Sequence, residues 1–283
     1  MRKKQILPPA HYLDKQIAQT VHPVLVNLIG VGGTGSHVLL ALADINQTLL
    51  NLGGPGLVVR AFDAKKVASH NLGRQRFSEA EIGMEKADAL INRINRCTGT
   101  YWRAMIHAFS EDYELSLQKY LSAQITISCV DTVKARFEIE RILLRYVANE
   151  QDNVRESPSY WLDFGNGRDF GQVFLSTLQS IEQPSSKEYN PVPTLPIFTQ
   201  EYRQWLESID DRDGPSCSTA EALSRQDMFV NPILANCGCR LLWRLLIEGK
   251  TTTRGIFVNA GEYKMVPVPV SLPPKKTALK KAA

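Results

Sequence analysis

Gly30-Val31-Gly32-Gly33-Thr34-Gly35 stands between an apolar run and an apolar segment that suits a helix. The run before it, Val24 to Ile29, has the length and composition of a buried strand. Glycines permit a tight turn from strand to helix, and they let backbone N–H groups approach a phosphate at the helix N-terminus. The stretch therefore predicts a strand, a glycine turn and a helix over about residues 23–50. Such a loop also fits NAD, FAD and S-adenosylmethionine sites, or a turn that binds nothing.

A second apolar run, Leu57 to Phe62, ends at Asp63 and predicts a second strand, parallel to the first. A carboxylate at this position can accept hydrogen bonds from the hydroxyls of a ribose. Asp63 follows Gly30 at a longer distance than the roughly 20 residues usual for such sites, and a longer connection over Asn46 to Gly56 accounts for the excess. The alternative is an ordinary surface acid at a strand end.

Two cations follow Asp63 and favour a reaction at phosphate. Arg74 lies in Asn71-Leu72-Gly73-Arg74-Gln75, and Lys86 follows it. Arginine offers a forked contact to phosphate and lysine a point charge. Hydride transfer needs no such cations, whereas cleavage between the α- and β-phosphates needs positive charge on the departing pyrophosphate. Each residue alone is more often a surface cation, but their combination in this order favours a functional role.

Asp131 follows the short apolar run Ile125 to Val130, which is typical of a strand covered on both faces. A carboxylate here can hold Mg²⁺, which prefers carboxylate and phosphate oxygens over a full protein cage. It can also cap the helix predicted from Val133 to Val147, and one residue can do both.

Taken together, the glycine loop, Asp63, the Asn71–Gln75 motif, Lys86 and Cys-x-Asp131 resemble the ThiF family of ubiquitin-activating-like adenylating enzymes. The resemblance is dense over about residues 20–140 and thinner to about 250. It continues at Gly171-Gln172-Val173 and at Cys217, and it is closest to the ThiF-like proteins of the PRTRC plasmid cassette. The resemblance implies a Rossmann-like α/β fold and MgATP-dependent adenylation of the C-terminal glycine of a small ubiquitin-like protein. It also implies a homodimer, since the family is commonly dimeric.

The resemblance assigns roles residue by residue. Asp63 would hold the ribose, Asp131 the Mg²⁺, and Cys217 would accept the acyl group as a thioester or would instead be a small buried residue. Arg74 and Lys86 would be catalytic as well as nucleotide-binding. The full set implied for ATP is Gly30, Gly32, Gly33, Gly35, Asp63, Asn71, Arg74, Gln75 and Lys86.

The chain departs from the family pattern at three places. Lys15 stands where the family often has an arginine that reaches the partner subunit's ATP, and Lys65 stands where it often has a second acid. No Cys-x-x-Cys pair occurs, so the zinc knuckle of many bacterial members is absent. Cys237 and Cys239 are spaced too tightly for that motif and fall in a predicted helix, so we expect them to be packed in the core.

Composition excludes several classes of protein. The chain has 283 residues, 43% of them hydrophobic, and no apolar run long enough to span a membrane. Its formal charge of +4 comes from basic residues at the two ends, so nucleic-acid binding is not expected. Five cysteines, an odd number, favour reduced thiols and a cytoplasmic protein.

The predicted organisation is a lead-in over residues 1–20, one domain over 21–270 and a basic tail over 271–283. The domain has a nucleotide-binding half to about residue 150 and a carrier-binding half beyond it, with a long loop over about 177–215. A mostly parallel sheet is expected in the first half, continuing into further strands in the second. The further elements that we predict are helices over Glu79–Asn95 and Asp227–Ile247 and strands over Tyr160–Phe164, Gly171–Ser176 and Gly255–Asn259.

The sequence thus favours an ATP-dependent adenylating enzyme with Mg²⁺ as its metal. Two other functions stay open. The chain can be an adaptor that binds a nucleotide or a ubiquitin-like partner without turnover, because Lys15 and Lys65 depart from the pattern. It can also be a nicotinamide-dependent oxidoreductase, although Arg74 and Lys86 weigh against this and no Tyr-x-x-x-Lys pair of the short-chain type occurs.

Overall fold

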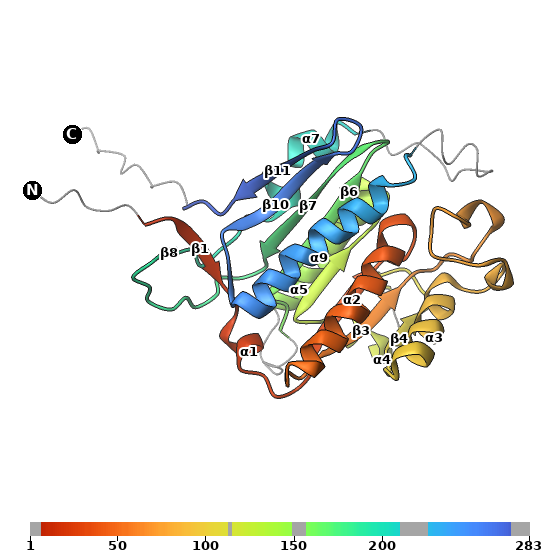
Figure 1. Ribbon diagram of the computed structural model, residues 1–283, viewed down its shortest axis with the longest axis horizontal. Coiled ribbons are helices and arrows are strands. Elements are labelled where there is room, and N and C mark those ends of the chain that lie inside the picture. The colour runs from red at the N-terminus through yellow and green to blue at the C-terminus, as the bar shows by residue number, and fades with distance from the viewer. Residues whose placement is uncertain (1–6, 113–114, 149–156, 210–225, 273–283) are drawn as a thin grey trace, which may run out of the picture.

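An eight-stranded sheet with helices on both faces forms the body of the protein in the computed structural model, which describes residues 7–112, 115–148, 157–209 and 226–272 (Figure 1). The strand order is β11-β10-β7-β6-β5-β2-β3-β4. The strands are β2 Val24–Ile29, β3 Leu57–Phe62, β4 Arg103–Met105, β5 Ile125–Ser128, β6 Tyr160–Asn166, β7 Phe170–Thr177, β10 Thr253–Asn259 and β11 Lys264–Pro269. The longer helices are α2 Gly33–Asn51, α3 Lys86–Thr98, α5 Val133–Ala148 and α9 Val230–Glu248, and the short ones are α1 Lys15–Ala18, α4 Leu115–Gln118, α6 Phe198–Glu201 and α7 Arg203–Glu207.

The pairing of neighbouring strands changes once across the sheet, from parallel to antiparallel. From β4 to β6 all neighbouring strands are parallel, and from β6 to β11 all are antiparallel. Crossover helices join the parallel strands, whereas β6 and β7 form a hairpin. This confirms the predicted α/β class, with a parallel sheet first and further strands after it.

Alternating side chains of the central strands fill two separate cores. Leu28 and Leu162 face α2 and α9, which lie side by side on one face (Figure 1). Their chain neighbours Ile29 and Trp161 face α5 on the opposite side. Both faces of the parallel strands are therefore buried, which explains why Val24 to Ile29 is almost entirely apolar.

The edge strand β11 exposes most of its residues and carries two prolines. Val270 donates its backbone N–H to Thr252 O at 2.9 Å, just beyond the ladder that pairs β11 with β10. Donors alternate along an antiparallel strand, so Pro267 and Pro269 lie at the positions that point away from β10. Proline has no N–H to donate, so its place on the outward row costs the sheet no hydrogen bond.

The N-terminal segment and the long loop meet in a small second sheet, order β8-β1-β9. Its strands are β1 Pro9–Tyr12, β8 Asn190–Pro191 and β9 Lys250–Thr251. β8 lies inside the stretch that we predicted as a long loop, and β1 lies inside the predicted lead-in. Pairing between such distant segments leaves little trace in local sequence, particularly for a strand of two residues.

One predicted helix begins later than expected. We predicted a helix from Glu79, but Glu79–Glu81 is a single 3₁₀ turn and α3 begins at Lys86. Gly83 between them has φ +88°, a left-handed conformation that ends a helical run. No helix within the described ranges is both long and apolar enough to cross a membrane.

Candidate active site

The carboxyl ends of the parallel strands meet at one edge of the sheet, and the predicted site residues follow these ends. β2 leads into the glycine loop, β3 into Asp63, and β5 into the loop that carries Asp131. Gly30 N–H donates to Phe62 O and Cys129 N–H donates to Ile29 O, both at 2.8 Å. This edge is where open α/β sheets bind ligands.

The four glycines of the loop have different neighbours. Gly30 has φ +82°, and a Cβ on Gly35 would lie 1.8 Å from Gly30 O, so both permit close packing of the backbone. A Cβ on Gly33 would lie 2.8 Å from Nδ2 of Asn231 on α9. Gly32 alone faces open space, with the Gln75 amide as its nearest neighbour at 4.0 Å. The loop is therefore open to a ligand at Gly32.

Asp63 joins the glycine loop to the end of β3. Its Oδ2 accepts the Val31 N–H at 2.9 Å, and its Oδ1 accepts the Lys65 N–H at 2.8 Å. Lys65 O in turn accepts the Lys86 N–H at 3.0 Å. One half-buried carboxylate thus fixes both the loop and the segment that leads to Lys86.

Arg74 and Gln75 each bury a polar atom that has no hydrogen-bond partner in the described part of the chain. These atoms are Arg74 Nε and Gln75 Oε1. Burial lowers the pKa of the Arg74 guanidinium, whose other arm donates to Gln226 Oε1 at 2.7 Å. A buried polar atom without a partner costs free energy, so both atoms suit a polar ligand over the glycine loop.

Asn71 shapes the turn that carries these two residues. It is buried, and its Oδ1 accepts the Ala68 N–H at 2.9 Å, while its carbonyl accepts the Gln75 N–H at 3.0 Å. The contacts found for Asn71 are thus internal to the loop.

Lys86, the first residue of α3, is only 5% exposed. Its ammonium lies 5.9 Å from the centre of the Phe77 ring, close enough for a cation–π contact. Burial lowers the pKa of Lys86, the charge of Asp63 opposes that shift, and the charge of Arg74 adds to it. The charges of Lys65 and Asp131 also act on this ammonium, so the structure brings the predicted charged residues together.

Asp131 is exposed and forms an ion pair with Lys65, with 3.0 Å between Oδ2 and Nζ. Desolvation would raise the pKa of the Asp131 carboxyl, but the charge and hydrogen bond of Lys65, a backbone hydrogen bond and the charge of Arg136 together lower it. The described residues contain no group of three or more His, Cys, Asp or Glu side chains placed to hold a metal ion. A carboxylate is the right donor for Mg²⁺, but of the two predicted carboxylates here Asp63 accepts backbone N–H groups with both oxygens and Asp131 already contacts Lys65.

The family model of the ThiF family matches residues 5–149, which is half of the chain. The chain belongs to the ThiF family.

Solved structures share the fold of this ThiF-family chain at low sequence identity. A structure of E. coli MccB with ATP is 15% identical, with a TM-score of 0.55 over 92% of this chain and 68% of that one. PaaA is 12% identical, with a TM-score of 0.56 over 90% of this chain and 65% of that one. MccB in complex with N-formylated MccA is 15% identical, with a TM-score of 0.53 over 92% and 68%. The chain thus spans about two thirds of these proteins, and none of the curated proteins matches it by sequence.

The side-chain amide of Asn231 connects several residues around the ThiF-type site, and the sequence did not predict this role. We call Asn231 and its hydrogen-bond partners the polar hub. Asn231 Oδ1 accepts Thr34 Oγ1–H at 2.9 Å and Asn166 Nδ2–H at 3.0 Å. Its Nδ2 donates at 2.9 Å to Gln226 Oε1, the same atom that accepts from Arg74. The hub therefore connects the glycine loop to Arg74 through α9. The one hint in the sequence is an asparagine at the start of the apolar helix, which also suits an ordinary helix start.

A buried ion pair supports the strands under the ThiF-type site. Arg136 Nε donates to Asp163 Oδ2 at 3.2 Å, and its Nη2 donates to the carbonyls of Val130 and Phe164. Ser128 Oγ donates to the other oxygen of Asp163. These contacts fix the ends of β5 and β6, and the Asp131 loop begins at the end of β5.

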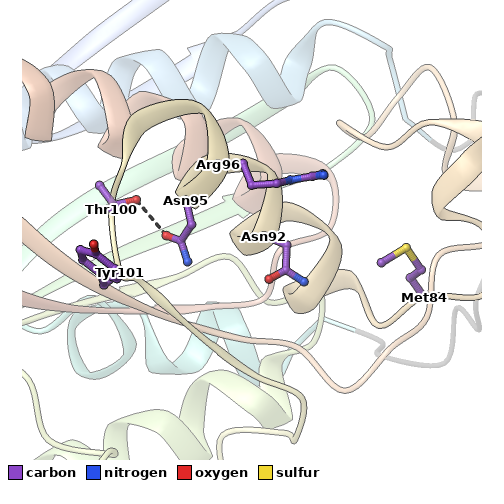
Figure 2. A pocket seen from close by; sticks show the side chains of 6 residues that line it. All are labelled: Met84, Asn92, Asn95, Arg96, Thr100 and Tyr101. Carbon is purple, nitrogen blue, oxygen red and sulfur yellow. Dashed lines mark hydrogen bonds between the residues drawn. The ribbon is translucent and has the colours of Figure 1, made fainter.

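Two cysteines predicted to be packed in the core differ in burial. Cys217 lies outside the described residues. Cys239 is buried, as predicted, whereas Cys237 is only partly buried. A shallow hollow of about 580 Å³ beside α3 contains none of the predicted site residues (Figure 2). It is lined by Met84, Asn92, Asn95, Arg96, Thr100 and Tyr101.

Proposed function

We propose that this protein adenylates a carboxylate with ATP, and that the carboxylate is the C-terminus of a small ubiquitin-like protein. The supporting observation is the pair of desolvated cations, Arg74 and Lys86, beside a glycine loop with an open face. The unpartnered atoms of Arg74 and Gln75 add polar groups for the same ligand. MccB is among the similar solved structures with ATP and with N-formylated MccA, which is in keeping with a nucleotide and a second substrate.

In this proposal the substrate carboxylate attacks the α-phosphorus of ATP. A bond forms between a carboxylate oxygen and phosphorus, the bond to the bridging α,β-oxygen breaks, and pyrophosphate leaves with that oxygen. Arg74 and Lys86 neutralise the charge that develops on pyrophosphate, and their burial strengthens the interaction. Asp63 holds the ribose, and the backbone around Gly32 receives the phosphates.

Magnesium that arrives with ATP would supply further neutralisation of phosphate charge, and Asp131 would be its protein ligand, shared with the Lys65 ammonium. Asn71 would contribute mainly by holding the loop of Arg74 and Gln75, since its contacts are internal to that loop. We also carry forward, as proposals, a homodimer, a cytoplasmic location, membership of the PRTRC subgroup and a thioester at Cys217.

ATP–pyrophosphate exchange in the presence of candidate ubiquitin-like proteins tests the proposal. Arg74→Met and Lys86→Met keep apolar bulk in the half-buried and buried positions while removing the charge. Each should slow exchange about 10²-fold or more, the scale for losing one preorganised donor. Arg96→Met, an exposed cation on the outer side of α3, is the control and should exchange like wild type.

The same preparation separates the rival functions. Calorimetry should show binding of ATP and none of NAD. Binding of NAD without ATP would indicate an oxidoreductase, and ATP binding with no exchange for any carrier would indicate an adaptor. Unchanged exchange in Arg74→Met or Lys86→Met would remove that residue from the mechanism.

A further inference from the structure

Lys65 occupies a fixed place between the predicted ribose and phosphate residues. Its N–H donates to Asp63 Oδ1 at 2.8 Å, and its carbonyl accepts the Lys86 N–H at 3.0 Å. The backbone of Lys65 is therefore held at both ends by residues of the candidate site. Its side chain starts from a defined position rather than from a free surface loop.

The side chain then crosses from the β3 loop to the β5 loop. Its ammonium lies 3.0 Å from Asp131 Oδ2, with the two side chains 64% and 76% exposed. An ammonium has three N–H donors, and the contact with Asp131 uses one. The charge of Lys65 also acts on Lys86 and lowers its pKa, so the Lys65 ammonium lies near another proposed phosphate-binding cation.

The two carboxylates of the site, Asp63 and Asp131, already have partners within the protein, so few oxygen atoms are free to bind a metal ion. Both oxygens of Asp63 accept backbone N–H groups, and Asp131 is paired with Lys65. An Mg²⁺ ion that arrives with ATP would therefore have to share one exposed carboxylate with an ammonium. In the described ranges no larger cluster of metal-binding side chains is present.

We propose that Lys65 is a third phosphate-binding cation of this site and takes over part of the charge neutralisation that a protein-held Mg²⁺ would provide. The ammonium stays on Asp131 and donates its remaining hydrogens to phosphate oxygens of the nucleotide. This inference rests on the proposed function only in taking a nucleoside triphosphate as the ligand. It follows that ATP binding should depend weakly on Mg²⁺.

The test is calorimetric titration of the full chain with ATP, without carrier protein, once in excess EDTA and once in excess Mg²⁺. Wild type should bind ATP in EDTA with a dissociation constant within about tenfold of its value in Mg²⁺. Lys65→Met should weaken binding in EDTA by about tenfold or more, because a charge-assisted hydrogen bond is lost. In excess Mg²⁺ the same variant should lose much less affinity for ATP, because the metal then neutralises the charge of the phosphates.

Lys66→Met is a matched control. Lys66 is the next residue, is 65% exposed against 64% for Lys65, and pairs with Glu85 at 3.5 Å instead of with Asp131. It carries the same charge on the same segment, so it should leave both dissociation constants unchanged. An equal loss in the two variants would mean that only net charge matters, and it would overturn the proposal.

A second variant tests the metal side of the argument. Lys65→Glu directs a second carboxylate toward Asp131, so ATP binding should become strongly dependent on Mg²⁺, and Mn²⁺ binding should appear in paramagnetic resonance. Unchanged ATP binding in EDTA by Lys65→Met would refute the role of Lys65 and leave the proposed function intact. No ATP binding by wild type in either condition would refute both.

Discussion

Gly33→Ala should destabilise the wild-type protein, but it should be neutral or stabilising in a protein that lacks the Asn231 side chain. A Cβ at position 33 would lie 2.8 Å from Asn231 Nδ2 and 3.0 Å from both Cγ and Oδ1. These distances are shorter than van der Waals contact, so the Asn231 side-chain amide would have to move to make room for the Cβ. Asn231 is 1% exposed and makes hydrogen bonds with Thr34, Asn166 and Gln226, so the amide has little freedom to give way.

The size of the effect follows from these bonds. Losing three hydrogen bonds at about 0.5–1.5 kcal/mol each lowers the free energy of unfolding by about 2–4 kcal/mol. Alanine is better than glycine in a helix by at most about 1 kcal/mol, so this gain does not offset the loss. In an Asn231→Ala background the colliding amide is absent. Gly33→Ala should then be neutral or stabilise the protein by up to about 1 kcal/mol.

Urea unfolding of wild type, both single variants and the double variant measures this coupling. We expect a coupling free energy of about 2 kcal/mol or more, well above the roughly 0.5 kcal/mol scatter found for independent sites. If Gly33→Ala destabilises both backgrounds equally, the hub does not restrict the glycine loop and the reasoning fails.

Two further outcomes are expected. Burial and the charge of Arg76 lower the pKa of His37 to about 4, below the roughly 6.5 of an unfolded histidine. The unfolded chain therefore binds the proton first, and stability should fall as pH drops from about 6.5 toward about 4. Between about pH 7.5 and about pH 5, the urea midpoint of His37→Gln should fall by less than that of wild type. An identical fall in the two proteins would show that His37 does not cause the pH dependence. Part of the fall should remain in the variant, because burial also lowers the pKa of His11. Cys217→Ala should leave pyrophosphate exchange nearly intact, because adenylation needs no thiol. If Cys217 is a nucleophile, that variant alone should lose a thiol-sensitive adduct with the carrier on non-reducing gels, and an adduct that persists would place the nucleophile elsewhere.

Much of the fold could be predicted because its parallel half leaves a local signal. Strands buried on both faces are continuous apolar runs, and Val24 to Ile29 and Leu57 to Phe62 are found as predicted. The helix that we placed from Glu79 was wrong at its start, since Gly83 interrupts the helical spacing. β11 was not predicted, because an exposed edge strand with two prolines has neither periodicity nor strand-like composition.

The site could be predicted in part for a different reason. The motifs single out Asp63, Arg74, Lys86 and Asp131, and in the structure the charges of the other three act on Lys86. The motifs do not reveal which residues support them, because such contacts link distant segments. Asn231 reaches Thr34 across 197 residues, and Lys65 reaches Asp131 across 66. The roles of these residues toward a ligand stay predictions.

The prolines of β11 prevent another strand from extending the sheet at this edge. A strand added beyond β11 would find carbonyl oxygens but no N–H groups at Pro267 and Pro269, so the ladder could not continue in register. At the opposite edge β4 has three residues, which is little for another chain to pair with. Neither a second copy of this protein nor the extended end of a carrier should therefore add a strand to the eight-stranded sheet. A partner that meets this part of the molecule has to contact side chains, where single substitutions can distinguish one partner from another.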